Sequence, residues 1–344
     1  MSSIATTMTA PLAKRITHIG HIHNFRGLAA VFIVATHVLA ALDWSDSPGL
    51  ERVLRYFFAN GTTFFLFISG YLFEYLSTRF EIASYWRQKL RFVVLPYLIV
   101  SAPALFLFTQ VMHREGVKSD FYQQPVATQI IGFLVTGKHL APFWFIPTIV
   151  AFFLFAPIIR AAFRRDAAFA TLPVLFLLPA WFARSENALL NLIHFLPIWV
   201  MGMAICRFRD TVEPWVRSKW ILLLVAGTAL GIAEVVWTAG THTYLGYLQK
   251  TLLILFLLSV LLKLGPRADR WLGSAGTLSF GLFFVHSYVI SGSALILKRA
   301  FGTLPEGSLF MVVLSTVVAV AISALIVQTI GRIFGSRSRL VIGV

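Results

Sequence analysis

The feature that most constrains this chain is a series of apolar segments, each about as long as a membrane is thick. They cover approximately residues 24–42, 56–77, 90–111, 143–160, 168–183, 188–206, 220–238, 245–264, 277–297 and 308–334. A helix needs about 20 apolar residues to cross a bilayer. Only 12% of the residues are charged, whereas soluble domains carry about a quarter. We therefore predict an all-α, polytopic integral membrane protein with about ten transmembrane helices, which excludes a water-soluble fold.

The positive charges indicate how these helices are oriented. The formal net charge is +15, and most Lys and Arg residues fall in the connections on the same side as the N-terminus. Cytoplasmic loops are the positive ones in membrane proteins. We therefore expect the N-terminus to be cytoplasmic and, for an even number of crossings, the C-terminus as well. The membrane accounts for the basic balance, so no nucleic-acid partner is expected.

The chain divides into one membrane domain with two short tails. We expect a cytoplasmic N-terminal tail at 1–22, a transmembrane domain at 23–335 and a cytoplasmic C-terminal tail at 336–344. Residues 14–40 imitate a cleavable signal peptide, but the apolar run continues to Leu42, which favours a retained helix. The connection at 112–142 is the longest on the outer side, and its part at 126–135 is expected to be a short interfacial helix. The single cysteine, Cys206, allows no intrachain disulfide.

Arg26 and His37 are the candidate functional pair. Ionisable side chains inside a bilayer are expensive and usually functional. Eleven residues turn a helix by about three turns plus 20°, so both side chains share one face, roughly 16 Å apart along the axis. Arg26 is either an interfacial cation or an anchor for a phosphate-bearing ligand. His37 is either a helix–helix hydrogen-bonding residue or a general base.

Other polar residues in or near the spans are secondary candidates. Glu74 is expected at a depth similar to Arg26 and to form an ion pair with it. The cluster of Arg87, Lys89 and Arg91 is a topology signal or a second phosphate grip. Residues expected to form hydrogen bonds between helices, or to serve the site in a minor role, are Asn60, Ser69, His194, Glu234 and His286. The alternating His18, His21 and His23 lie in a tail without preorganisation, so no metal site is assigned.

Five stretches, taken in order, resemble the acyltransferase-3 family of integral membrane O-acyltransferases. They are NFRGLAA at 24–30 with His37 following, FFANGTTFFLFISGYL at 57–72, RFVVLPY at 91–97, WFIP at 144–147 and SFGLFFVH at 279–286. The resemblance spans roughly residues 18–330, and Arg26 and His37 match the essential pair of the family. The family often has two arginines separated by two residues before the third span. Arg87, Lys89 and Arg91 do not reproduce that spacing, so the assignment of the CoA-binding cation among them stays open.

The resemblance implies transfer of an acyl group, most often acetyl, from cytoplasmic acyl-CoA to a hydroxyl of a carbohydrate or other small acceptor. It also suggests a bacterial inner (plasma) membrane. On this hypothesis Arg26 and the 87–91 cluster hold the phosphates of acyl-CoA, which is a co-substrate, and neutral His37 deprotonates the acceptor. Asn60, Thr62 or Ser69 are candidate oxyanion donors. The alternatives are a transporter or flippase for an anionic or glycan-linked substrate, and a non-catalytic scaffold in which Arg26 and His37 are dispensable.

Overall fold

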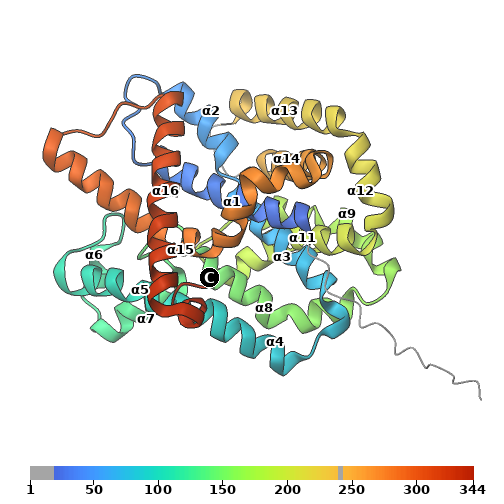
Figure 1. Ribbon diagram of the computed structural model, residues 1–344, viewed down its shortest axis with the longest axis horizontal. Helices are drawn as coiled ribbons and strands as arrows, with labels where there is room; N and C mark the ends of the chain where they lie inside the picture. Colours follow the sequence, from blue (N-terminus) through green and yellow to red (C-terminus); the bar gives the residue numbers. More distant parts are fainter. Residues whose placement is uncertain (1–18, 239–242) are drawn as a thin grey trace, which may run out of the picture.

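The computed structural model describes residues 19–238 and 243–344, and this part of the chain is helical (Figure 1). Within it, eight helical stretches are long and apolar enough to cross a membrane. One of them, Tyr244–Phe301, has 58 residues and contains two helices, α14 (Tyr244–Leu264) and α15 (Asp269–Phe301), joined by the turn η5 (Gly265–Ala268). The prediction of an all-α, polytopic membrane protein is confirmed.

Helix α1 (Gly20–Leu39) lies in the middle of the molecule and positions the candidate site (Figure 1). It packs against α15, α3 (Gly61–Tyr75), α16 (Leu309–Phe334) and α2 (Pro48–Phe58). The contact with α15 is close because glycines face it from both sides: a Cβ on Gly27 would lie 2.5 Å from the Leu272 carbonyl oxygen, and one on Gly276 would lie 2.5 Å from that of His23. Small residues allow helix backbones to approach in this way inside membranes.

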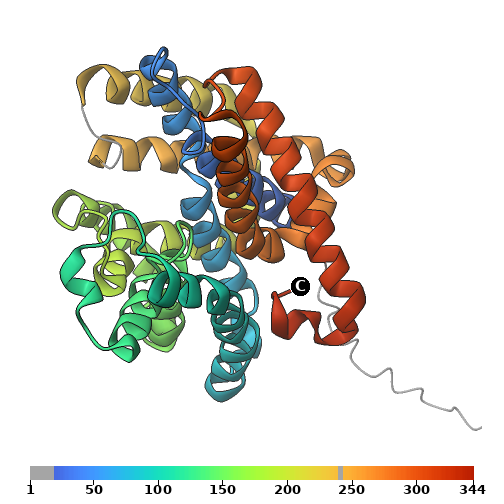
Figure 2. The same cartoon turned by 90° about the vertical axis from the view of Figure 1, so that its left-hand side faces the viewer.

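The second close crossing joins α3 to α11 (Ala188–Arg207). Gly70 on α3 lies against the backbone of Trp199, and Gly202 on α11 lies against the backbone of Phe67 and Tyr71. Helices α8 (Phe145–Ala162) and α12 (Arg209–Ser218) extend the packing around α11, and α13 (Trp220–Trp237) packs on α14. Figure 2 shows α13 and α14 on one side of α1 and the green and teal helices on the other.

The third predicted span is one continuous but irregular helical stretch. It runs through α4 (Ile82–Lys89), the π-helix η2 (Leu90–Val94), α5 (Leu95–Phe106) and the π-helix η3 (Leu107–Val111). Pro96 has no N–H with which to reach the carbonyl of Phe92, which explains the widened turn that precedes it. A helix is present at the predicted 126–135 as α7 (Val126–Thr136), after the short α6 (Ser119–Tyr122), and its place at the membrane interface stays a prediction.

The fifth apolar segment, expected at 168–183, does not form one long helix. Asp166–Trp181 is apolar but consists of η4 (Asp166–Thr171), α9 (Leu172–Leu175) and α10 (Leu178–Trp181). Pro173 and Pro179 each lie in the first turn of one short helix. Proline is tolerated there but blocks continuation from the preceding turn, so each proline restarts the helix.

The C-terminal end returns to the middle of the molecule. After α16 the chain makes the turn η6 (Gly335–Arg337) and the short helix α17 (Ser338–Val341), which packs on α5 and η2.

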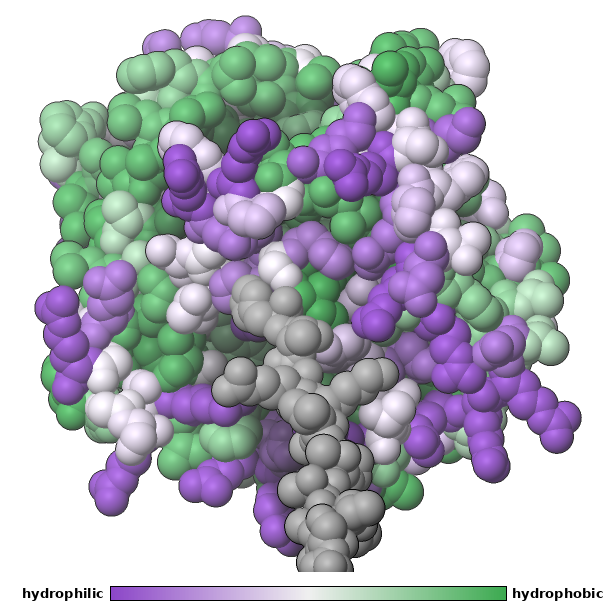
Figure 3. Space-filling model, turned by 45° about the vertical axis from the view of Figure 1, so that its right-hand side comes forward, coloured by the Kyte–Doolittle hydropathy of each residue, from purple (hydrophilic) through white to green (hydrophobic). Residues whose placement is uncertain are grey.

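Figure 3 shows hydrophilic residues gathered over one face of the molecule, with apolar residues along its left and upper margins. An apolar margin beside a polar face is the pattern expected of a protein that spans a bilayer.

Candidate active site

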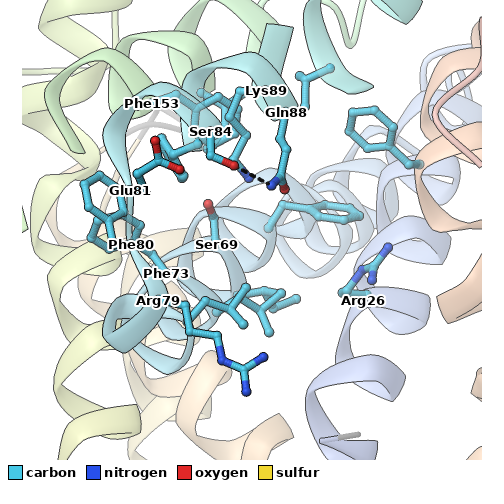
Figure 4. A pocket seen from close by; sticks show the side chains of 18 of the residues that line it. Arg26, Ser69, Phe73, Arg79, Phe80, Glu81, Ser84, Gln88, Lys89 and Phe153 are labelled. Carbon is cyan, nitrogen blue, oxygen red and sulfur yellow. Dashed lines mark hydrogen bonds between the residues drawn. The ribbon is translucent and has the colours of Figure 1, made fainter. Parts of the chain in front are cut away.

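A cavity of about 510 Å³ lies between α1, α3, α4, α8 and α15, at the end of the molecule where α1 begins and α3 ends. Figure 4 shows Arg26 on one side of it, with Arg79, Glu81, Ser84, Gln88 and Lys89 around the other. Its remaining lining is largely aromatic and aliphatic, and includes Phe65, Phe73, Phe145, Phe153 and Phe280. The volume is that of a small-molecule site, and its wall combines cations with apolar surface.

Arg26 projects from α1 toward α15 and into this cavity. Its Nη2 donates to the Ser279 hydroxyl at 3.0 Å, and that hydroxyl in turn donates to the Gly276 carbonyl at 2.9 Å. Among the residues that the structure describes, Arg26 forms no ion pair with a carboxylate. The guanidinium therefore retains donors that a ligand phosphate or carboxylate can occupy.

The expected ion pair between Arg26 and Glu74 is wrong. Glu74 accepts instead from Arg207 on α11, at 3.0 Å, and Arg207 also binds Asp166 at 2.8 Å. The reason is the direction in which each side chain leaves its helix: the end of α3 that carries Glu74 packs on α11, whereas Arg26 faces α15. Glu74 is thus paired within the contact of α3 with α11, and it does not neutralise Arg26.

The three basic residues before and within η2 divide between two environments. Lys89 lines the cavity, and its Nζ lies 4.5 Å from the centre of the Phe153 ring and 5.2 Å from that of Tyr85. Arg87 and Arg91 are outside the cavity lining. Arg91 stacks on Phe92 instead, at 5.6 Å. Of this cluster, only Lys89 is placed to meet a ligand next to Arg26.

Two further cations near the cavity were not singled out from the sequence. Arg79, in η1 (Ser77–Arg79) just after α3, lines the cavity. Arg339 of α17 lies close enough to act electrostatically on both Arg26 and Lys89, and its guanidinium is 4.2 Å from the centre of the Phe92 ring. Their loop and C-terminal positions resemble ordinary topology signals, and only the fold brings Arg79 into the cavity lining and Arg339 near Arg26 and Lys89.

His37 meets His286 of α15. Their ring centres are 5.2 Å apart with the planes inclined by 39°. His286 is fully buried and its Nδ1 lies 2.8 Å from the Leu282 carbonyl oxygen. Because a carbonyl only accepts, Nδ1 carries the hydrogen and Nε2 keeps its lone pair. That Nε2 has no hydrogen-bond partner among the described residues, so the pair contains an unused buried acceptor.

His139 shows what a purely structural buried histidine looks like in this protein. It lies between α7 and α8, where Nδ1 contacts the Phe133 carbonyl at 3.0 Å and Nε2 contacts the Ser101 hydroxyl at 2.8 Å. Burial lowers its pKa to about 4, so it is neutral at physiological pH. His194 likewise contacts a backbone carbonyl, that of Phe182, at 2.7 Å. An unsatisfied ring nitrogen thus distinguishes His286 from His139.

Phe283 lies between the cavity and the histidine pair. It is 3% exposed and contacts the rings of Phe145 and Phe280, which line the cavity, with ring centres 5.7 and 6.4 Å away. On its other side it contacts His286 at 6.3 Å. The residues that line the cavity and the histidine pair therefore contact one shared aromatic side chain.

The remaining predicted residues have separate positions. Ser69 lines the cavity (Figure 4). Asn60 is buried, and its Nδ2 donates to the carbonyls of Tyr56 and Phe57 at 3.1 and 2.6 Å, so it closes the last turn of α2. Glu234 accepts from Thr243. His21 and His23 contact Glu213 and the Gly273 carbonyl, at 3.2 and 2.9 Å, and His18 lies outside the described residues.

Residues 19–328 match the family model described as an acyltransferase domain, that of the acyltransferase-3 family. The match covers most of the chain and includes the cavity, Arg26, His37 and His286. Neither a curated protein nor a solved structure matches the chain.

Proposed function

Because this chain belongs to the acyltransferase-3 family, we propose that it transfers an acyl group from acyl-CoA, with acetyl-CoA as the reference donor, to a hydroxyl of a carbohydrate or related acceptor. The observation that carries the proposal is a cavity in which three cations, Arg26, Arg79 and Lys89, accompany a single carboxylate, Glu81. The aromatic wall suits the adenine ring and the pantetheine arm, and the cations suit the phosphates.

The membrane orientation follows from the same residues. The cavity lies at the end of the membrane domain where α1 begins, and this is the side on which the connections are basic. With the N-terminus in the cytoplasm, the cavity faces the compartment in which acyl-CoA is made. His37 lies roughly 16 Å further along α1 from Arg26. A donor held by its phosphates at the cavity thus extends its thioester toward the histidine pair once Phe283 moves aside.

The chemistry assigned to His37 is that of a general base. Its neutral imidazole takes the proton from the acceptor hydroxyl as the oxygen attacks the thioester carbonyl. The tetrahedral intermediate then collapses, the C–S bond breaks, and the proton passes from His37 to the thiolate sulfur. The products are the acyl ester of the acceptor and free CoA, so no acyl-enzyme and no redox step is needed. Holding the base and the thioester together would supply a large part of such catalysis.

His286 has a supporting role in this proposal. To accept the proton at one ring nitrogen, His37 must carry its own hydrogen on the other, and that N–H needs an acceptor because an unpaired buried donor is costly. The Nε2 lone pair of His286 is buried, unpartnered within the described chain and next to the His37 ring. Its Nδ1–H is fixed on the Leu282 carbonyl. His286 thus acts as a positioning residue that stabilises protonated His37, in the manner of the third member of a catalytic triad.

The test uses the full-length protein in nanodiscs, with radiolabelled acetyl-CoA binding and release of CoA thiol as separate readouts. Loss of a charge-assisted contact to phosphate is expected to weaken binding about tenfold to a hundredfold in Arg26→Ala. His37→Ala should retain binding and lose turnover. The matched control is Arg87→Ala. It removes an arginine of α4 that is outside the cavity lining. Folded wild-type protein that binds no acyl-CoA would refute the proposal and direct attention to transport.

A further inference from the structure

A second cavity, which we call the outer groove, lies beyond the histidine pair on the side away from Arg26. Its volume is about 380 Å³, and it is formed by the end of α1 with α15 and α16. Its lining is apolar except for Ser293 and Ser315. Helices α15 and α16 pack against each other, and Figure 2 shows them adjacent.

The groove adjoins the histidine pair. Val38, next to His37 in α1, lines it, and so does Ala41 in the turn that follows the helix. Val289 and Ile290 also line it, three and four residues after His286. Residues three and four apart lie on the same face of a helix, so on α15 the groove continues the face that carries the His286 ring, while the end of α1 and the turn after it form the other side. Arg26, the histidine pair and the outer groove therefore follow one another along α1.

We propose that the outer groove holds the acyl chain of a donor that is longer than acetyl, an inference that rests on the proposed function. A thioester whose CoA phosphates are bound near Arg26 and whose carbonyl is at His37 has its acyl chain pointing onward along α1, into the groove. The wall is apolar, as an alkyl chain requires. The volume of about 380 Å³ corresponds to roughly thirteen groups the size of a water molecule, at about 30 Å³ each. An acetyl methyl would fill a small part of it, whereas a chain of about eight carbons fits.

The competing occupant is a membrane lipid. A lipid tail in the groove would make its shape irrelevant to the choice of donor. An acyl chain in the groove instead links donor affinity to chain length, because each buried methylene contributes about fourfold to binding. The two occupants therefore differ in a measurable quantity, the ratio of octanoyl-CoA to acetyl-CoA affinity.

The experiment measures that ratio in nanodiscs by displacement of radiolabelled CoA with unlabelled acetyl-CoA and octanoyl-CoA. Wild type is expected to bind octanoyl-CoA at least about tenfold more tightly. Ala294→Phe, which fills the groove from α15, should abolish this preference while leaving acetyl-CoA affinity within about twofold, and the acetyl-CoA value also reports folding. Ser315→Phe fills the groove from α16 and should do the same. Ala300→Phe adds the same ring to α15 outside the groove lining and should change neither affinity.

The outcomes separate this inference from the proposed function. If wild type binds acetyl-CoA but gains nothing from the octanoyl chain, or if both groove-filling variants keep the preference, the groove is occupied by lipid only and the inference is overturned. If wild type binds no acyl-CoA of either length, the proposed function fails and the inference fails with it. Loss of the preference in Ala294→Phe and Ser315→Phe, but not in Ala300→Phe, supports the acyl-chain site.

Discussion

The crossing of α3 and α11 predicts a large effect of adding one methyl group, in Gly70→Ala. The new Cβ would overlap the carbonyl oxygen of Trp199 and lie 2.8 Å from the carbonyl carbon of the same residue. Both atoms belong to the backbone of α11 and cannot rotate away, so the helices must separate. The crossing is also close on the other helix, where Gly202 faces the backbone of Phe67 and Tyr71.

The expected cost can be estimated from these contacts. Overpacking a tight contact costs about 1–3 kcal/mol, and a backbone obstacle places Gly70→Ala at the upper end. The intrinsic helix preference of alanine over glycine returns about 1 kcal/mol. The net loss of about 2 kcal/mol should lower the melting temperature of a chain of this length by roughly 3 °C. Because α3 also carries Ser69 into the cavity, weaker binding of acetyl-CoA should accompany the lower stability.

The assay is thermal unfolding of detergent-solubilised protein, followed by circular dichroism, together with acetyl-CoA binding. Gly292→Ala is the matched control, because a Cβ at Gly292, on α15, would meet no atom within 4 Å. That control should melt at the wild-type temperature or slightly above it. If Gly70→Ala melts with wild type, α3 and α11 are not held at the distance described, and the packing argument is refuted.

Three further predictions concern single side chains. His286→Gln should reduce turnover about tenfold or more and leave the KM for acyl-CoA unchanged. If His286 only packs against its neighbours, the substitution should change both turnover and KM, and steady-state kinetics distinguishes these outcomes. Arg207→Met removes the partner of Glu74. Since Arg207 is 37% exposed, thermal unfolding should show a loss of only about 1 kcal/mol in stability, and the affinity for acetyl-CoA should not change. A weaker affinity would place Glu74 in the site. Burial alone would raise the pKa of Glu213, but contacts from His21 and Tyr71 hold it below its usual value, so its contribution is present above the unfolded pKa and lost as pH falls through the folded one. Wild type should therefore be more stable than Glu213→Gln at pH 7, and the difference should shrink as the pH falls through the folded pKa of Glu213; a difference that does not change on acidification would contradict the assignment.

The helices could be predicted because the hydropathy of a segment depends only on the residues within it. Nine of the ten apolar segments became helices near their expected bounds, and the exception at 168–183 contains Pro173 and Pro179, which restart the helix. Which of the three basic residues before the third span faces the cavity could also be predicted in part. At 100° per residue, Arg87 and Arg91 share one face of a helix and Lys89 lies opposite. Lys89 alone reaches the cavity.

Contacts between distant segments were not predictable in the same way. Both histidines of the pair were candidates, but they are 249 residues apart in the sequence, and only the packing of α1 on α15 joins them. Similar depth suggested that Glu74 would meet Arg26, yet depth says nothing about which neighbour a side chain faces. Arg79 entered the cavity from a short turn whose sequence carries no sign of a ligand site.

The position of Phe283 also has a consequence for the energetics of the cell. A hydrophobic constriction resists water and hydrated ions, and Phe283 is in ring contact with Phe145, Phe280 and His286 at the inner end of the histidine pair. An acyl chain is apolar and can displace such a ring, whereas a proton or sodium ion would have to shed its hydration there. On the proposed function, displacement of Phe283 therefore admits an acyl chain but not a hydrated ion, and acyl transfer toward the far leaflet would leave the membrane potential intact.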